Sequence, residues 1–177
     1  ATLVNPSIDA GVIAPVAGPT LVGMGDKVWI DANGNGVQDG GEAALAGVVV
    51  NLLNADGTPA TDANGNPVAP VTTDAQGNYF IGNLLPGTYK AQFTLPSGYV
   101  FTSTGAGTSA TDSNATPGAN PLIGTTGTFT IAASATGDTT ASNQSNASFA
   151  NLTIDAGVRP VVGMGDYTWI DTNMNGV

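Results

Sequence analysis

Two runs of residues in this chain occur twice, at a spacing typical of whole domains. The run GMGDKVWIDANGNGV that begins at Gly23 returns at Gly163 as GMGDYTWIDTNMNGV, and the run IDAGV at Ile8 returns at Ile154. The first pair lies 140 residues apart (23 to 163) and the second 146 (8 to 154). The difference falls in the Pro-containing stretches that connect the two runs. Because repetition at a fixed spacing is the signature of a tandem array, the sequence predicts a series of similar domains.

We interpret the Pro-containing stretches as joints between domains, because insertions and deletions are tolerated best in linkers. The chain is then out of phase with its domains. We expect residues 1–13 to be the last strand of a preceding repeat and residues 14–22 to be a linker. Residues 23–160 form one complete repeat, and residues 161–177 begin the next one.

The complete repeat has the pattern of strands and turns. Short apolar or alternating runs are separated by Gly, Asn, Asp and Pro, and no segment keeps an apolar helical period over three turns. Tyr89 to Phe93 alternates like a half-buried strand, whereas Val48 to Leu53 is continuous enough to be buried on both faces. Strands are expected near residues 27–30, 47–53, 78–82, 87–95, 98–102, 127–132 and 147–155. About seven short strands at this spacing predict an all-β, Greek-key β-sandwich, with residues 103–126 as a long loop.

One acidic loop fills every position of an EF-hand calcium loop. It runs for twelve residues from Asp31 to Glu42, with Gly36 at the sharp turn of position 6. Glu42 is the only Glu of the chain, and it stands at position 12, where a bidentate carboxylate is needed. Ca²⁺ takes six to eight oxygen ligands, and a loop of this length suits it better than the smaller Mg²⁺. The expected ligands are Asp31, Asn33, Asn35, Val37, Asp39 and Glu42.

A solvated Asn-Gly turn is the alternative interpretation of this loop, but such a turn would not require Asp39 and Glu42 at these offsets. The flanking residues are extended rather than helical, so the loop is expected to join two strands and to act as a structural site rather than as a sensor. Its first half recurs in the following unit, where the corresponding ligands are Asp171, Asn173 and Asn175.

Other acidic residues form weaker patterns. Asp62-Ala-Asn-Gly-Asn and Asp74-Ala-Gln-Gly-Asn resemble halves of a calcium loop, but neither has a distal acid, and Asx turns explain them equally well. A second metal site is expected from Asp26, at the start of the repeat, together with Asp112 and Asn114 in the long loop.

Further motifs on both sides of the loop extend the recognisable sequence pattern over residues 22–160. The matching segments are Gly25-Asp26-x-Val28-Trp29-Ile30-Asp31, Gly47-Val48-x-Val50-x-Leu52, Leu85-Pro86-Gly87-Thr88-Tyr89, Asp112-Ser113-Asn114 and Asp155-Ala156-Gly157. This pattern resembles the B-type repeats of serine-aspartate-repeat surface adhesins, within the wider collagen-adhesin B-type family. The resemblance implies an immunoglobulin-like sandwich, several calcium ions per repeat and a stalk that holds a binding region away from the cell. Residues 103–153 are longer and richer in Thr, Ser and Ala than the family pattern, so extra strands or a lateral contact surface are two expectations for them.

Composition excludes several classes of function. The chain has 13 acidic and 3 basic residues, a net charge of −10, so nucleic acid and anionic membranes are poor partners. No apolar run approaches the roughly 18 residues that span a bilayer, so no membrane insertion is expected. The absence of Cys and His removes thiol nucleophiles, imidazole ligands and the usual general base. A glycosidase would need a pair of carboxyl groups, one of them with a raised pKa. The sequence offers no such partner, so no enzyme is predicted.

Two non-enzymatic functions remain open from the sequence. The first is a stalk or spacer repeat of an extracellular surface protein or adhesin, rigidified by Ca²⁺. The second is a self-assembling module of an extracellular filament, or a ligand-binding adhesin domain. The expected partners are neighbouring repeats of the same protein, and in the second case other copies in a filament. The expected location is the cell surface or a cell-surface appendage.

Overall fold

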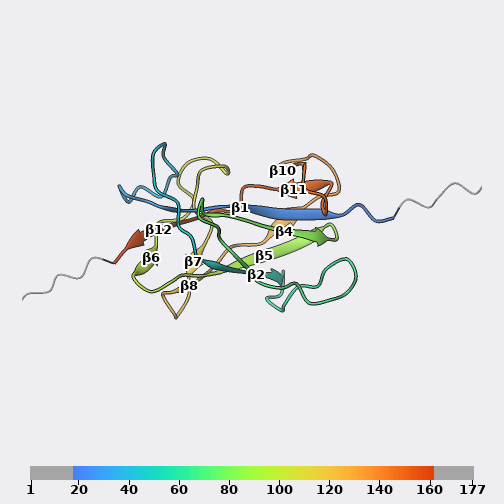
Figure 1. The fold of residues 1–177 in the computed structure, drawn as a ribbon, viewed down its shortest axis with the longest axis horizontal. Helices are drawn as coiled ribbons and strands as arrows, with labels where there is room; N and C mark the ends of the chain where they lie inside the picture. Colours follow the sequence, from blue (N-terminus) through green and yellow to red (C-terminus); the bar gives the residue numbers. More distant parts are fainter. Residues whose placement is uncertain (1–17, 162–177) are drawn as a thin grey trace, which may run out of the picture.

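The computed structural model describes residues 18–161 of the 177-residue chain (Figure 1). Within this part of the chain there are twelve strands in two sheets, so the prediction of an all-β fold is confirmed. The same residues contain no helix long and apolar enough to cross a membrane. The predicted strand at residues 1–13 and the repeated loop with Asp171, Asn173 and Asn175 lie outside the described residues.

The first sheet is built around one long strand. Its members are β1 (Val22–Ile30), β4 (Asn78–Leu84), β6 (Tyr99–Phe101), β10 (Thr139–Ala141), β11 (Phe149–Asn151) and β12 (Ala156–Pro160). Strand β4 runs antiparallel to β1. Two short strands pair with β1 in parallel, β11 beside its beginning and β12 beside its end. Strand β10 extends the sheet from β11, and β6 extends it from β12.

The second sheet is centred on β5. Its members are β2 (Val49–Asn54), β3 (Val71–Thr72), β5 (Gly87–Thr94), β7 (Thr116–Pro117), β8 (Ile123–Thr125) and β9 (Phe129–Ile131). Strand β2 pairs with one side of β5, and β8 and β9 pair with β5 as well. Figure 1 shows β1 and β11 along one side of the molecule and β2, β5 and β8 along the other. This two-sheet arrangement is that of an immunoglobulin-like sandwich.

The core lies between the inward faces of the two sheets. Trp29 and Met24 of the first sheet and Phe93 of the second are fully buried, and the rings of Tyr79 and Phe93 meet edge to face at 5.7 Å. The predicted alternation of Tyr89 to Phe93 is confirmed, because Lys90 and Gln92 are half-buried between buried neighbours. The prediction of burial on both faces for residues 48–53 is wrong, since burial alternates along β2 as well. Strand β2 therefore has one buried face and one half-buried face, although its apolar run is continuous.

Each predicted strand region contains a strand, but the structure adds others. Residues 103–126 were predicted as a loop, and they contain β7 and β8, so this prediction is wrong for the second half of the segment. The expected extra strands within residues 103–153 are thereby found. The last strand, β12, was also missed. Gly157 in this strand leaves no room for a side chain, because a Cβ atom there would lie 2.7 Å from the ring of Trp29.

The described chain begins and ends at opposite extremes of the molecule. Strand β1 begins toward one end of the long axis, and β12 ends toward the other (Figure 1). The two strands are nevertheless hydrogen-bonded neighbours, with Val28 paired to Ala156 and Ile30 to Val158.

Candidate metal centres

The acidic loop begins where β1 ends, and its two stems are fixed by main-chain hydrogen bonds. The amide of Asp31 donates to the carbonyl of Val158 in β12 at 2.8 Å. The amide of Ile30 donates to Ala43 at 2.7 Å, and the amide of Leu45 donates back to Val28 at 2.9 Å. The chain therefore returns alongside β1 after the loop, where Ala44 forms an isolated bridge with Trp29, before it continues to β2 in the second sheet.

Asp31 organises the first half of the loop from a buried position. Its side chain is 1 % exposed, and Oδ1 accepts the amide of Gly34 at 2.7 Å. Oδ2 accepts the amide of Gly36 at 2.8 Å and the hydroxyl of Thr102 at 2.5 Å. Burial acts to raise the pKa of Asp31, but these hydrogen bonds outweigh it and hold the pKa below its ordinary value. The carboxylate is therefore ionised at neutral pH.

The other side-chain ligands predicted for the loop are joined to one another. Asp39 Oδ2 accepts the amide nitrogens of Asn33 and Asn35, each at 2.8 Å. Glu42 closes the loop, because Oε1 accepts the amide of Ala32 and Oε2 accepts the amide of Asp39, both at 2.9 Å. The structure thus brings together four predicted ligands from positions 3, 5, 9 and 12. The amide of Val37 donates to Asn35 Oδ1 at 2.8 Å.

The donor set fits a hard cation that prefers oxygen ligands. Within residues 18–161, no three acidic side chains converge closely enough to hold a metal by themselves. Ligation at this loop would therefore combine its carboxylates with amide and main-chain oxygens, as Ca²⁺ sites do. The amide groups of Asn33 and Asn35 present nitrogen toward Asp39, and a half-turn of each planar amide presents oxygen instead.

The first half of the predicted long loop packs on the acidic loop. The amide of Gln38 donates to the carbonyl of Thr111 at 2.7 Å, and Val37 pairs with Asp112 in an isolated β-bridge. A Cβ on Gly36 would lie 2.7 Å from the carbonyl oxygen of Ser103, so the two loops touch at their main chains. Residues 103–115 therefore connect the acidic loop with the second predicted site.

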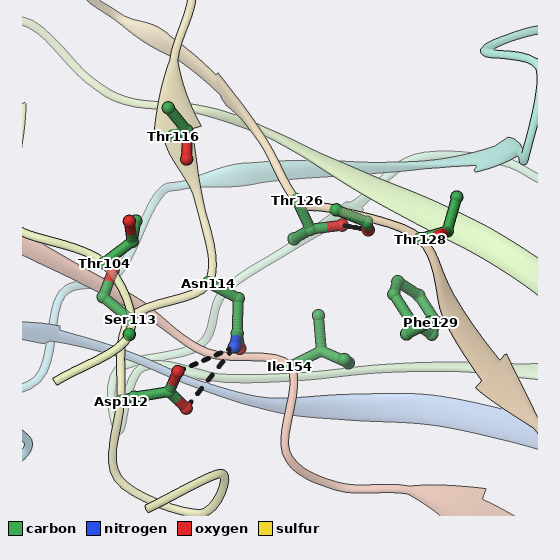
Figure 2. A pocket seen from close by; sticks show the side chains of 11 residues that line it. Thr104, Asp112, Ser113, Asn114, Thr116, Thr126, Thr128, Phe129 and Ile154 are labelled. Atoms are coloured by element: carbon green, nitrogen blue, oxygen red, sulfur yellow. Dashed lines mark hydrogen bonds between the residues drawn. The ribbon is translucent and has the colours of Figure 1, made fainter. Parts of the chain in front are cut away.

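The second predicted site centres on Asp155, a residue that was not among the ligands predicted from the sequence. Asn114 Oδ1 accepts the amide of Asp155 at 2.6 Å, and the amide of Asn114 donates to the carbonyl of Asp155 at 2.9 Å. The Asn114 side-chain nitrogen lies 3.4 Å from both carboxylate oxygens of Asp112 (Figure 2). The carboxyl groups of Asp26 and Asp155 lie close enough to affect each other's pKa. The structure therefore places Asp26 and Asn114 beside Asp155, and Asn114 links Asp112 to them.

Asp155 is a fully buried carboxyl group with one oxygen that has no protein partner. Oδ1 accepts the amide of Lys27 at 3.2 Å, whereas Oδ2 has no hydrogen bond. Burial, followed by the charge of Asp26, raises its pKa to about 9. Burial also raises the pKa of Asp26. A buried, unpartnered carboxylate oxygen beside a second carboxyl group fits a bound cation, which would satisfy both. The recurrence of the IDAG run at Ile8 was the sequence signal that marked Asp155.

A pocket of about 280 Å³ opens beside this second site. Figure 2 shows Asp112 and Asn114 at one side of the pocket, with Thr116, Thr126 and Phe129 on other walls. The lining combines hydroxyl and carboxylate groups with the apolar side chains of Phe129 and Ile154. This pocket gives the Asp112 carboxyl group, whose pKa is raised by burial, a route to solvent.

The two half-loops are turns held by their own carboxylates. Asp62 Oδ1 accepts the amides of Asn64 and Asn66, each at 2.9 Å. Asp74 Oδ1 accepts the amides of Gln76 and Asn78 at 2.9 and 2.8 Å. The same pattern in both hairpins supports the Asx-turn interpretation rather than a metal site.

Comparison with known proteins gives one consistent result. The model of the SdrD B-like domain family matches residues 22–158. The serine-aspartate repeat-containing protein F of Staphylococcus epidermidis is 36 % identical over 176 residues, which are 98 % of this chain and 8 % of that protein. The serine-aspartate repeat-containing protein D of Staphylococcus aureus (strain Newman) is 35 % identical over 175 residues, 97 % of this chain and 10 % of that protein. The chain thus spans about a tenth of the length of these relatives.

Proposed function

Because this chain belongs to the SdrD B-like domain family, we propose that residues 23–160 are a structural repeat of an extracellular surface protein, rigidified by bound calcium. The role is that of a stalk or spacer, without catalysis. Its partners are the neighbouring repeats of the same protein, and its location is the cell surface.

The observation that carries the calcium part of this proposal is the arrangement of the acidic loop. Three carboxylates and two amides occupy the EF-hand ligand positions. The side chains of Asn33 and Asn35 meet at Asp39, and Glu42 accepts the main-chain amide of Asp39. We assign Asp31, Asn33, Asn35, Asp39 and Glu42 as side-chain ligands and the carbonyl of Val37 as the main-chain ligand. Bound Ca²⁺ would supply the positive charge that offsets the repulsion among the carboxylates.

A second calcium centre follows from the buried carboxyl pair. Asp26 and Asp155 would supply two carboxylates, and amide or main-chain oxygens would complete the ligand shell, because no three acidic groups of the described residues converge there. Asn114 links Asp155 to Asp112 through hydrogen bonds. These residues come from β1, from the connection before β12 and from the loop 103–115. A cation at this centre would join the beginning, the middle and the end of the repeat, which is how it would rigidify the fold.

The stalk role is supported by the placement of the chain ends. The described chain enters and leaves at opposite ends of the long axis, so repeats joined by short linkers would extend end to end (Figure 1). The matches to the two staphylococcal proteins cover 97–98 % of the chain, although the family model covers only residues 22–158. The flanking residues 1–13 and 161–177 are therefore proposed to belong to neighbouring repeats.

Calorimetric titration with Ca²⁺ tests the proposal. Wild-type chain is expected to bind with a Kd of about 10⁻³ M or tighter, which suffices where extracellular calcium is plentiful. Binding to the native state raises the melting temperature by mass action. Glu42→Gln is expected to weaken binding because it removes one charge and the bidentate ligand. Asp56→Asn, an exposed turn residue bonded to Thr58, is the charge-matched control and should leave binding unchanged. A melting temperature that is the same in calcium and in chelator would refute the calcium role.

A further inference from the structure

The acidic loop contains two Asn-Gly pairs, Asn33–Gly34 and Asn35–Gly36. Asn followed by Gly is the sequence in which the side-chain amide is lost most readily, because Gly has no side chain to keep its main-chain nitrogen away from the Asn Cγ atom. Both glycines have positive φ angles, +74° and +77°, so the loop geometry favours Gly at these positions. The fold therefore favours Gly after both Asn residues, and this places a chemically labile sequence within the acidic loop.

The reaction is a substitution followed by hydrolysis. The main-chain nitrogen of the glycine loses its proton and attacks the Asn Cγ atom, forming a cyclic imide, and the side-chain nitrogen leaves as ammonia. Water then opens the ring at either carbonyl, which gives Asp or isoaspartate. The net change is amide plus water to carboxylate plus ammonium, and no oxidant or reductant is needed.

The structure holds both attacking nitrogens on one carboxylate. The amide of Gly34 donates to Asp31 Oδ1 at 2.7 Å, and the amide of Gly36 donates to Asp31 Oδ2 at 2.8 Å. Asp31 is itself buried and held by the hydroxyl of Thr102 at 2.5 Å. The side chains of Asn33 and Asn35 are exposed, so water has access to the amides that would react.

We propose that Asn33 and Asn35 are deamidation sites and that the Asp31 carboxylate suppresses the reaction in the folded loop. Two effects of Asp31 act in the same direction. Its negative charge disfavours loss of the proton from either glycine nitrogen, and the hydrogen bonds fix both peptide planes. Reaction then requires the loop to open locally. Another Asn-Gly pair outside the loop, Asn64–Gly65, has a different arrangement, because the amide of Gly65 donates to the neutral main-chain carbonyl of Asp62 at 2.9 Å.

Deamidation would change the ligand set of the loop. Conversion to Asp adds a negative charge at position 3 or 5, whereas isoaspartate lengthens the main chain by one carbon and displaces the following ligands. This inference deepens the proposed calcium function of the same loop, but the two hydrogen bonds involve protein atoms only and do not depend on the metal.

Peptide mapping by mass spectrometry tests the proposal on the full chain. Samples are incubated at mildly alkaline pH, folded in calcium-free buffer and unfolded in urea, and the mass gain at each Asn is followed. At Asn33 and Asn35 the rate is expected to be at least about tenfold lower in the folded chain, because the reaction waits for local opening. Asn64 should be less protected. Equal rates in folded and unfolded chain at Asn33 or Asn35 would overturn the proposal.

Two variants with the same change in charge separate the role of Asp31 from a general loss of negative charge. Asp31→Asn is expected to bring both rates close to those of the unfolded chain. Asp56→Asn alters an exposed turn outside the loop and leaves both glycine amides bound to Asp31, so deamidation at Asn33 and Asn35 should stay slow. Acceleration by both variants alike would overturn the role of Asp31. If calcium fails to bind but Asp31→Asn still accelerates the reaction, the calcium proposal fails and this one stands. If Asp31→Asn does not fold, the wild-type comparison in urea still decides.

Discussion

The main-chain amide of Lys27 donates to the Asp155 carboxylate at 3.2 Å, which joins the first strand to the end of the repeat across 128 residues of sequence. The same carboxyl group contacts Asp26, and the main-chain amide of Asp155 donates to Asn114. Asp155 is thus the residue at which the first strand, the long loop and the last strand meet, and its ionisation is expected to control the stability of the repeat.

Asp155→Asn is expected to have opposite effects with and without calcium. In chelator it should raise the melting temperature, because it removes a buried carboxyl group that faces Asp26. In saturating calcium it should reduce the stabilisation gained from the ion. Thermal melts in both buffers measure the difference. Asp74→Asn, which alters only an Asx turn, should lower the melting temperature equally in both. A loss from Asp155→Asn that is identical in the two buffers would contradict the second metal centre.

Stability in calcium-free buffer is expected to fall as the pH rises between 3.8 and about 9, the ordinary and the raised pKa of Asp155. In this range the folded chain binds a proton that the unfolded chain has already released, so each increase in pH favours unfolding. The lowered pKa of Asp31 acts in the opposite sense, but its contribution is lost only on acidification below its unfolded pKa. Melting temperatures across this range, with Asp155→Asn as the control that flattens the slope, test the expectation. A stability that rises toward pH 9 would contradict it.

Gly36→Ala is expected to destabilise the chain by about 1 kcal/mol or more, since a Cβ would lie 2.7 Å from Ser103 O at a φ of +77°. Gly40→Ala is the matched control in the same loop, because no atom lies within 4 Å of the position that its Cβ would take. Urea denaturation gives the free energy of unfolding of both variants. An equal loss for the two would show that contact between the acidic loop and residues 103–115 contributes nothing to stability.

Thr102→Val is expected to cost about 1–3 kcal/mol, because it leaves a buried Asp31 oxygen with one donor fewer while keeping the shape of the side chain. The pKa of Asp31 should rise toward its ordinary value, so the variant should also lose stability at a higher pH during acid titration. Thr72→Val, at an exposed position of β3, serves as the control. Acid denaturation monitored by circular dichroism compares the two variants.

The acidic loop was predictable from sequence because its ligands are local. Twelve consecutive residues fix the spacing of Asp31, Asn33, Asn35, Asp39 and Glu42. The structure joins the side chains of Asn33, Asn35 and Asp39 directly and ties Glu42 to the main chain of Asp39. Which of them bind a metal stays a prediction. The second centre could be predicted only in part, since strand order, rather than local spacing, brings Asp26 and the Asp112–Asn114 pair to Asp155. Local patterns found Asp26 and Asp112 but gave no reason to place Asp155 between them.

The missed strands have a related cause. Strand β12 contains Gly157 and ends at Pro160, residues that usually interrupt strands. Here Gly157 is required by the ring of Trp29, and Pro160 lies at the strand end beside β6. The short strands β7 and β8 form a hairpin whose pairing with β5 supplies the order that two- and three-residue segments lack alone. Tertiary contacts, rather than local preference, decide such elements.

The parallel pairing of β1 with β12 sets how the repeat would respond to a pull on its two ends. Tension would draw β1 by its N-terminal end and β12 by its C-terminal end, in opposite directions along adjacent strands. The hydrogen bonds between the paired segments, where Val28 faces Ala156 and Ile30 faces Val158, would then be loaded in shear, so they would have to break together rather than one at a time. A stalk built from such units would resist extension most strongly at the pair of strands that opens and closes each repeat.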